Sequence, residues 1–237
     1  MHSLDLNGGP PAGGDASRFD LLIFDCDGVL VDSEILSLTA YDELLRSIGI
    51  VVSEDDLLGC IGLKQADIFA RLEGLSGRSI PPEARATLWP RIRALFEAAL
   101  KPTEGLVDFL RPLTTKRCVA SSSDPDRIKL SLRLTGLAAY FGGAVFSTHQ
   151  VRRGKPAPDI YLFAAEQLQC RPPRCLVIED SAPGVEGARA AGMTAIGFAG
   201  GAHVRDGHAD RLAAAGAAAV FTNWAGVSEW LARGAVP

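Results

Sequence analysis

The sequence predicts an α/β protein with a Rossmann-like parallel sheet and an inserted all-helical domain. Two observations lead to this fold class. From about residue 104 onward, short apolar runs alternate with amphipathic segments, which is typical of right-handed crossovers and a parallel sheet covered on both faces. Before that point, one buried strand at residues 21–25 is followed by a purely helical pattern up to about residue 101.

The helical stretch is expected to fold as a separate domain. Gly49 is a natural C-terminal stop for its first helix. Ser53 and Asp56 have the spacing of a capping box at the start of its second helix. Pro90 should kink or split its last helix. We predict these helices at residues 35–49, 53–62, 63–75 and 81–101.

The alternating part supplies the rest of the sheet and its covering helices. We predict strands at residues 117–121, 144–147, 175–179, 194–199 and 219–221, and helices at 104–113, 124–136, 157–169, 180–192, 209–217 and 224–233. The predicted organisation is a flexible N-terminal tail at residues 1–18, a core made of residues 19–34 and 102–237, and a helical domain at residues 35–101.

Composition and charge exclude several classes of protein. The 237 residues carry a net charge of −4 without a run of Lys or Arg, so we expect no nucleic-acid partner. No apolar stretch approaches the roughly 20 residues of a membrane span, and residues 1–18 lack the apolar core of a signal peptide. We therefore expect a cytoplasmic protein that binds no membrane, and no protein partner is evident. The five cysteines are scattered and do not have zinc-site spacing.

Polar side chains follow four strands of the predicted sheet. In an open parallel sheet, ligands bind at the carboxyl ends of the strands, so these side chains should meet at one edge. The first strand ends in Asp25 and Asp27, the second in Ser121, Ser122 and Ser123, Lys155 follows the third, and the fourth ends in Glu179 and Asp180.

Each of these groups has an ordinary structural interpretation when it is taken alone. An acid after a strand is usually a turn or cap residue, and the serines before Pro125 could simply begin a helix. Lys155 alone would be a solvated surface lysine. These separate interpretations do not explain why acids, hydroxyls and a lysine all fall on the same edge.

The chemistry that fits the combination is metal-assisted phosphoryl transfer. Clustered carboxylates are stable beside Mg²⁺, which prefers oxygen ligands and offsets the repulsion between Asp25 and Asp180. One carboxylate can then attack phosphorus, while a second protonates the leaving oxygen. Because they are two residues apart on an extended chain, Asp25 and Asp27 lie on one side and can serve one substrate.

Four segments carry a resemblance to a known family. "FDCDGVLVDSE", "VASSS", "GKPAPD" and "IEDSAPGVEGARAAG" resemble, in order, the four motifs of the haloacid dehalogenase superfamily, and more narrowly its capped phosphatases and phosphomutases. The resemblance covers residues 19 to about 223. It implies a HAD-like core, a helical cap domain at residues 35–101, and hydrolysis through an aspartyl-phosphate with Mg²⁺ as cofactor.

The resemblance also implies a role for each motif residue. Asp25 would be the nucleophile, and Asp27 the general acid and then base. Ser121 would hold a phosphate oxygen, with Ser122 and Ser123 beside it, and Lys155 would pair with the nucleophile and the phosphate. The metal ligands would be Asp25, the backbone carbonyl of Asp27 and Asp180, with Glu179 a ligand or a residue supporting one.

Specificity is expected in the cap. Ser33 matches a position where core and cap meet, and the segment "GCIGLKQAD" matches a cap loop that reaches the site, which makes Lys64 and Gln65 substrate-binding candidates. The segment from Gly200 to Ala217 adds a similarity to the 6-phosphogluconate phosphatase-like branch. The expected partner is thus a small phosphorylated sugar or sugar acid. His203 and His208 are expected at the surface.

Two other functions remain open from the sequence. A β-phosphoglucomutase-like enzyme would share the core motifs, but such members carry basic residues at the positions of Ser37, Ile61 and Gln65. A phospho-accepting signalling module also clusters acids, a hydroxyl and a lysine, but it is about half as long and has no inserted cap. The dehalogenases themselves have a non-acidic residue at the position of Asp27.

Overall fold

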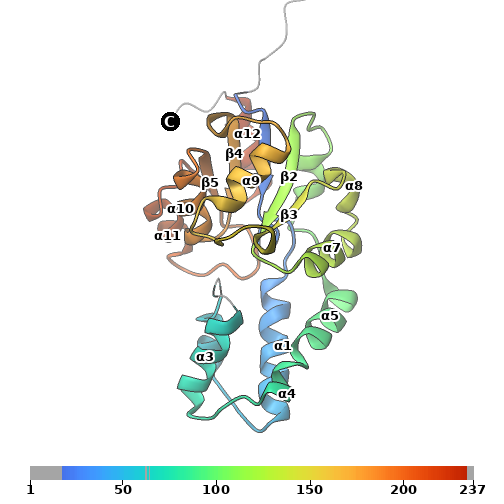
Figure 1. The fold of residues 1–237 in the computed structure, drawn as a ribbon, viewed down its shortest axis with the longest axis vertical. Helices are drawn as coiled ribbons and strands as arrows, with labels where there is room; N and C mark the ends of the chain where they lie inside the picture. Colours follow the sequence, from blue (N-terminus) through green and yellow to red (C-terminus); the bar gives the residue numbers. More distant parts are fainter. Residues whose placement is uncertain (1–17, 62, 64, 234–237) are drawn as a thin grey trace, which may run out of the picture.

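A computed structural model of the protein describes residues 18–61, 63 and 65–233. Its centre is a six-stranded parallel sheet with the order β3-β2-β1-β4-β5-β6 (Figure 1). The strands are β1 (Leu21–Phe24), β2 (Lys116–Ser121), β3 (Val145–Ser147), β4 (Cys175–Glu179), β5 (Thr194–Phe198) and β6 (Val220–Phe221). The predicted α/β class is confirmed, and β1 lies in the middle of the sheet between β2 and β4.

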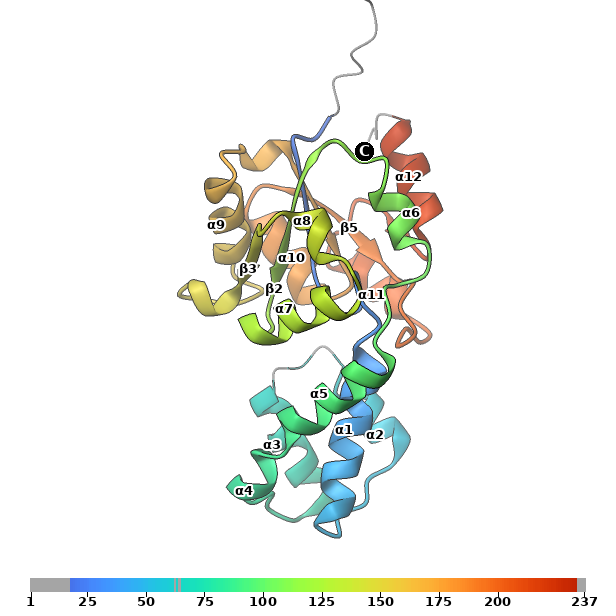
Figure 2. The same cartoon turned by 90° about the vertical axis from the view of Figure 1, so that its right-hand side faces the viewer.

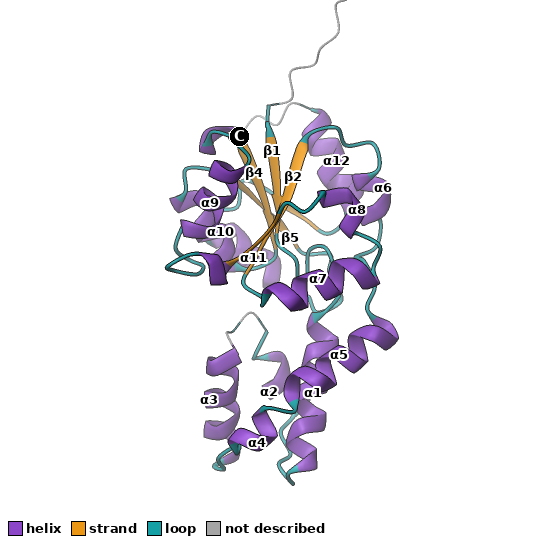
Figure 3. Ribbon diagram, turned by 45° about the vertical axis from the view of Figure 1, so that its right-hand side comes forward, coloured by secondary structure: helices purple, strands orange, loops and turns teal. Residues whose placement is uncertain are grey.

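Both faces of the sheet are covered by helices (Figure 3). Leu21 and Ile23 point to the face covered by α9 (Asp159–Gln167), α10 (Ala182–Ala190) and α11 (His208–Ala214). Leu22 and Phe24 point to the other face, which is covered by α6 (Leu106–Leu110), α7 (Pro125–Leu134), α8 (Ala138–Phe141) and α12 (Trp224–Ala232). Successive residues of a strand face opposite sides, so a strand buried on both faces has the continuous apolar run seen at β1.

The inserted segment forms a helical domain below the sheet (Figure 2). It consists of α1 (Glu34–Ser47), α2 (Glu54–Leu58), α3 (Gln65–Ser76), α4 (Pro82–Arg85) and α5 (Leu88–Ala99). The outgoing and returning chains pair where they cross, because the Asp32 N–H donates to the Lys101 carbonyl at 3.1 Å and the Thr103 N–H to the Leu30 carbonyl at 3.1 Å. These paired connectors join the helical domain to the end of β1.

Two of the three local signals in the helical domain act as the sequence predicts. Gly49 follows α1 with a left-handed φ of 72°, which ends the helix. Ser53 and Asp56 form the predicted capping box of α2. The predicted long last helix is split, but before Pro90, which lies in the first turn of α5 where no intrahelical N–H is required.

The structure also contains elements that the sequence pattern did not predict. These are α8 and two short 3₁₀ turns at Thr148–Gln150 and Pro172–Arg174. A single turn holds too few residues to show a helical period. Within the described residues, no helix has the length and apolar character needed to cross a membrane.

Candidate active site

The carboxyl ends of β1, β2 and β4 meet at one edge of the sheet because these strands are neighbours. Asp25 follows β1, and its backbone N–H donates to the carbonyl of Ile178 in β4 at 3.0 Å. Polar side chains from these ends and from the following loops are buried together. Asp25, Ser121, Lys155, Glu179 and Asp180 are each less than a tenth exposed.

Lys155 links two of the carboxylates. Its Nζ donates to Oδ1 of Asp25 and to Oε1 of Glu179, each at 2.5 Å, and to the carbonyl of Ala120 at 3.1 Å. Burial by itself lowers the pKa of Lys155, but the two carboxylates outweigh burial and raise that pKa well above its usual value. The ammonium group is therefore held charged against Asp25.

Glu179 is fully buried and uses both of its oxygens within the protein. Oε1 accepts from Lys155 and from the Tyr161 hydroxyl at 2.8 Å, and Oε2 accepts from the Ser181 N–H at 3.0 Å and its hydroxyl at 2.8 Å. Gly184 lies so close that a Cβ atom there would be 2.0 Å from this carboxyl group, so only glycine fits. Glu179 thus holds the Lys155 ammonium with an oxygen that Tyr161 also fixes.

Asp27 has a different set of partners. Its Oδ1 accepts from the Ser33 hydroxyl at 2.5 Å and from Arg127 Nη2 at 2.8 Å, and its Oδ2 accepts from the Ser123 hydroxyl at 2.6 Å. Ser33 lies just before α1, while Ser123 and Arg127 belong to the segment after β2. Three donors from two elements therefore fix the orientation of this carboxylate.

The two aspartates of the first motif consequently differ in proton affinity. Burial, followed by the neighbouring carboxylates, raises the pKa of Asp25 well above its usual range, although Lys155 opposes this. Burial also acts to raise the pKa of Asp27, but Arg127 and the hydroxyls of Ser123 and Ser33 outweigh it and lower that pKa. Groups with separated proton affinities in one site are suited to different chemical roles.

Asp180 lies beside two histidines. Nε2 of His203 is 3.1 Å from Asp180 Oδ2, and Nε2 of His208 is 2.7 Å from the Asp180 carbonyl. His203 is only 3% exposed, so its predicted surface position is wrong; the chain after β5 folds back over the site. Gly28 has a φ of 78°, and a Cβ there would be 2.0 Å from Asp180 Oδ2, so the loop after β1 packs tightly on this carboxylate.

The residues predicted to bind the phosphate and the rest of the substrate differ in how far they are exposed. The buried hydroxyl of Ser121 accepts from the Ser123 N–H at 3.0 Å, whereas Ser122 is exposed. Gln65 is exposed at the start of α3. Lys64 lies outside the described residues.

Arg127, Tyr161 and Glu34 are residues near this site that the sequence patterns did not identify. Arg127 contacts Asp27, and Tyr161 contacts Glu179. Burial, and next the charge of Asp27, raises the pKa of Glu34 to about 7. Glu34 directly follows Ser33 in the first motif, and this position was the sequence signal that could have identified it as a residue near the site. Arg127 and Tyr161 lie on helices, and only the folded structure shows that these two side chains face the site.

The donor set at this edge consists of oxygen atoms. Burial, and next the neighbouring Glu179, raises the pKa of Asp180 well above its usual range, as burial does for Asp25. A divalent cation relieves this repulsion, and Mg²⁺ prefers such ligands. No group of three or more His, Cys, Asp or Glu side chains in the described part of the chain is arranged to hold a metal ion. A cation here would thus depend on two carboxylates, a backbone carbonyl and water.

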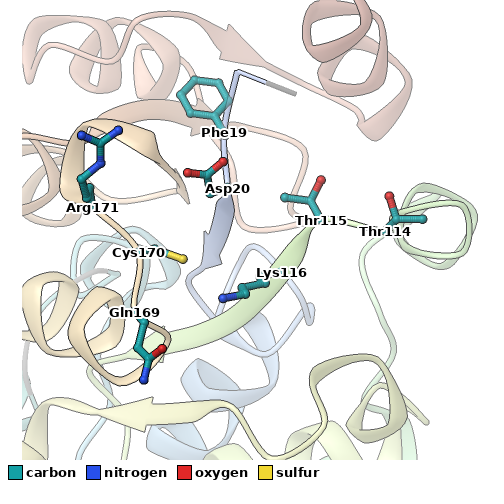
Figure 4. Close-up of a pocket in the computed structure, with 8 residues that line it drawn as sticks. All are labelled: Phe19, Asp20, Thr114, Thr115, Lys116, Gln169, Cys170 and Arg171. Carbon is teal, nitrogen blue, oxygen red and sulfur yellow. The ribbon is translucent and has the colours of Figure 1, made fainter. Parts of the chain in front are cut away.

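A separate pocket of about 540 Å³ lies at the opposite edge of the sheet, at the amino ends of β1, β2 and β4 (Figure 4). Two of its charged groups already have partners, since Asp20 pairs with Arg174 at 2.8 Å and Lys116 donates to the Leu168 carbonyl at 3.1 Å. It holds none of the motif residues. It is lined by Phe19, Asp20, Thr114, Thr115, Lys116, Gln169, Cys170 and Arg171.

Comparison with known proteins gives a family match. The haloacid dehalogenase-like hydrolases match residues 19–192. The 6-phosphogluconate phosphatase of Escherichia coli (strain K12) is 28% identical over 189 residues, which are 79% of this chain and 86% of that protein. A phosphorylated carbohydrates phosphatase of Thermotoga maritima is 34% identical over 181 residues, 75% of this chain and 83% of that protein.

A similar fold and sequence occur in a solved structure. It is a HAD family hydrolase from Deinococcus radiodurans R1 with bound phosphate and sodium. The two chains are 33% identical with a TM-score of 0.79, and the match covers 92% of this chain and 97% of that one. Core and helical domain are both included in a match of this extent.

Proposed function

Because the chain belongs to the haloacid dehalogenase-like hydrolases, we propose that it is a Mg²⁺-dependent phosphatase of a small phosphorylated metabolite. It would act through an aspartyl-phosphate formed on Asp25. The observation that carries this proposal is the contrast between two aspartates two residues apart. Asp25 faces the Lys155 ammonium, whereas Asp27 is held by three other donors. This contrast supports the proposal that Asp25 is the nucleophile and Asp27 the proton carrier.

In the first half-reaction, an Asp25 carboxylate oxygen forms a bond to phosphorus as the ester P–O bond breaks. The leaving oxygen takes a proton from Asp27, because an alkoxide is a poor leaving group. The donors around Asp27 favour its ionised form in the resting protein. A phosphate dianion arriving beside it raises its pKa, which supplies the protonated form when substrate is bound.

In the second half-reaction, water attacks the phosphorus of the aspartyl-phosphate. Asp27, now ionised, accepts a proton from that water, and the bond between phosphorus and the Asp25 oxygen breaks to release inorganic phosphate. Lys155 stays beside the Asp25 carboxylate throughout, and its charge stabilises negative charge that develops on the phosphoryl oxygens. Ser121 is proposed to hold one of those oxygens.

We propose that Mg²⁺ would be held by the carboxylates of Asp25 and Asp180 and by the backbone carbonyl of Asp27. When bound, the ion would favour the ionised form of Asp25 and neutralise charge on the phosphate, so that this carboxylate can approach it. The residues present fit this ion, because they offer oxygen ligands and an excess of buried negative charge. Glu179 has both oxygens engaged by protein donors, which favours a supporting role for it.

The proposed substrate is a sugar phosphate or a phosphorylated sugar acid. The support comes from the two related phosphatases, whose names specify 6-phosphogluconate and phosphorylated carbohydrates. The helical domain is proposed to act as the cap that selects among such substrates. Lys64, Gln65, Ser33, Ser122 and Ser123 are the candidate binding residues, and the hydroxyls of Ser33 and Ser123 additionally position Asp27.

A screen of phosphorylated metabolites with Mg²⁺, read by released phosphate, tests this proposal. 6-Phosphogluconate should be among the better substrates, and Asp25→Asn should serve as the inactive control. A second arm with β-glucose 1-phosphate and a trace of the bisphosphate tests the mutase alternative. Formation of glucose 6-phosphate faster than free phosphate would replace the phosphatase assignment with a sugar phosphomutase.

A further inference from the structure

Arg127 connects the catalytic edge of the sheet with the helical domain. It lies in the first turn of α7, and its Nη2 donates both to Oδ1 of Asp27 at 2.8 Å and to the hydroxyl of Ser37 in α1 at 3.0 Å. Its guanidinium also lies over the ring of Phe96 in α5, 5.1 Å from the ring centre. One side chain therefore contacts the proposed acid–base residue and two helices of the other domain.

The guanidinium is held at its position by the helical domain. Phe96 is 1% exposed, and Ser37, itself 7% exposed, is fixed because its hydroxyl donates to the Ser33 carbonyl at 2.9 Å. Only 18% of the Arg127 side chain is exposed. If α1 and α5 moved away from the sheet, Arg127 would lose the hydroxyl acceptor and the aromatic ring together, and of the contacts described above only its ion pair with Asp27 would remain.

The arrangement is a poor device for stability alone. The Nε of Arg127 is buried without a hydrogen-bond partner, and such a donor carries a desolvation penalty. Buried ion pairs often contribute less than apolar side chains of the same volume. A guanidinium at this place is better explained by what it does to Asp27.

We propose that Arg127 is a positioning residue that orients the Asp27 carboxylate for proton transfer only while the helical domain is seated on the sheet domain. This inference rests on the proposed phosphatase function. Arg127 supplies one of two donors to Oδ1 of Asp27, the other being Ser33, whereas Ser123 holds Oδ2. Asp27 is thereby aligned in the closed arrangement and released from one constraint when the domains separate.

The test compares two leaving groups in the full-length protein with Mg²⁺. The leaving group of 6-phosphogluconate is an alkoxide that needs a proton, whereas the leaving group of p-nitrophenyl phosphate is a phenolate that does not. Arg127→Ala should lower kcat/KM for 6-phosphogluconate by roughly 10- to 100-fold, part of a typical general acid contribution, with a much smaller loss for p-nitrophenyl phosphate. Added guanidinium at a non-denaturing concentration should restore part of the 6-phosphogluconate activity.

The matched control is Arg133→Ala, which changes an exposed arginine on the same helix. This variant should keep the wild-type kcat/KM for both substrates, and added guanidinium should not change it. If Arg127→Ala does not fold, Ser37→Ala removes the hydroxyl in the helical domain that accepts from Arg127. This variant should lose less kcat/KM than Arg127→Ala, and again more for 6-phosphogluconate than for p-nitrophenyl phosphate. Equal losses on both substrates, or no loss, would overturn the proposal. If the wild-type protein released phosphate from neither substrate nor from any compound of the metabolite screen, the phosphatase function itself would be rejected.

Discussion

The carboxyl edge of the sheet and the helix surfaces of the helical domain use charged side chains in different ways. At the carboxyl edge of the sheet, the side chains of Lys155 and Asp25 are 6% and 9% exposed and are 130 positions apart in the chain. In the helical domain, the pairs Arg46–Asp42 and Arg93–Glu97 are exposed and join residues one helical turn apart. Exposed pairs of this kind contribute about 0.3–0.5 kcal/mol each.

Under the proposed function, this difference separates catalysis at the sheet edge from substrate selection by the helical domain. Buried polar groups that satisfy one another cannot be exchanged singly without leaving an unpaired partner, so the edge of the sheet has a fixed chemistry. Solvated charges on helices can change with little effect on folding. Arg127 links the two regions, since it donates both to Asp27 at the sheet edge and to Ser37 in the helical domain. The predictions below test this separation.

Asp25→Asn should have the largest effect. Without the carboxylate no covalent intermediate can form, so turnover should fall by at least about 10³-fold, as is usual for loss of a nucleophile. The variant should fold, because the amide oxygen can still accept from Lys155, whose charge stays paired with Glu179. Phosphate release and mass spectrometry of the phosphorylated protein measure the effect. A variant that still accumulates a phosphoenzyme would remove Asp25 from the nucleophile role.

Removal of the metal should stop the wild-type reaction nearly as completely. Excess chelator should abolish phosphate release, Mg²⁺ should restore it, and Ca²⁺ should be a poor substitute because it prefers longer bonds and more ligands. The measurement is the rate of phosphate release during metal titration. Full activity in chelator would exclude the proposed Mg²⁺ dependence and leave the buried carboxylates at the sheet edge unexplained.

Asp27→Asn should slow the reaction without abolishing binding. The amide keeps the backbone carbonyl but cannot carry a proton, so both half-reactions should slow by roughly 10²- to 10⁴-fold. The pH–rate profile should lose its dependence on this group. An unchanged profile would show that the three donors around Asp27 have another purpose, and it would also weaken the role inferred for Arg127.

The outcome of sequence-based prediction follows the same division. The acids, serines and lysine could be predicted to converge because parallel strands end at one edge whatever the details of packing. Arg127, one of the three donors that orient Asp27, could not, because it is 100 positions away in the chain and reaches Asp27 only after α7 has packed. His203 was expected at the surface, yet it is buried where the chain after β5 returns to Asp180.

Lys64→Ala should affect selectivity more than chemistry. If Lys64 binds the free end of the substrate, its loss should raise KM for an anionic substrate such as 6-phosphogluconate by up to roughly tenfold, the value of one modest charged hydrogen bond, and should change a neutral sugar phosphate less. Lys129→Ala, an exposed lysine on α7, is the matched control. Equal changes on both substrates would show that Lys64 does not distinguish them.

The smallest effect concerns Glu34, which stands where β1's loop enters the helical domain. Its pKa is raised to about 7 by burial and then by the charge of Asp27. A carboxyl whose pKa is raised on folding contributes stability below its unfolded pKa of about 4.5, and this stability is lost as the pH rises through about 7. Wild-type unfolding free energy should therefore fall between pH 5 and pH 8 partly because Glu34 ionises.

Glu34→Gln removes that ionisation, so the variant should lose less stability than wild type over the same range. The difference between the two pH dependences should be on the order of 1–3 kcal/mol, with the variant the more stable protein at pH 8. Urea unfolding in the presence of chelator at both pH values measures it, and subtraction of the two proteins cancels the other titrating groups. Identical pH dependences would mean that water reaches Glu34 freely, and hence that the junction between the domains is more open than the contacts of Arg127 indicate.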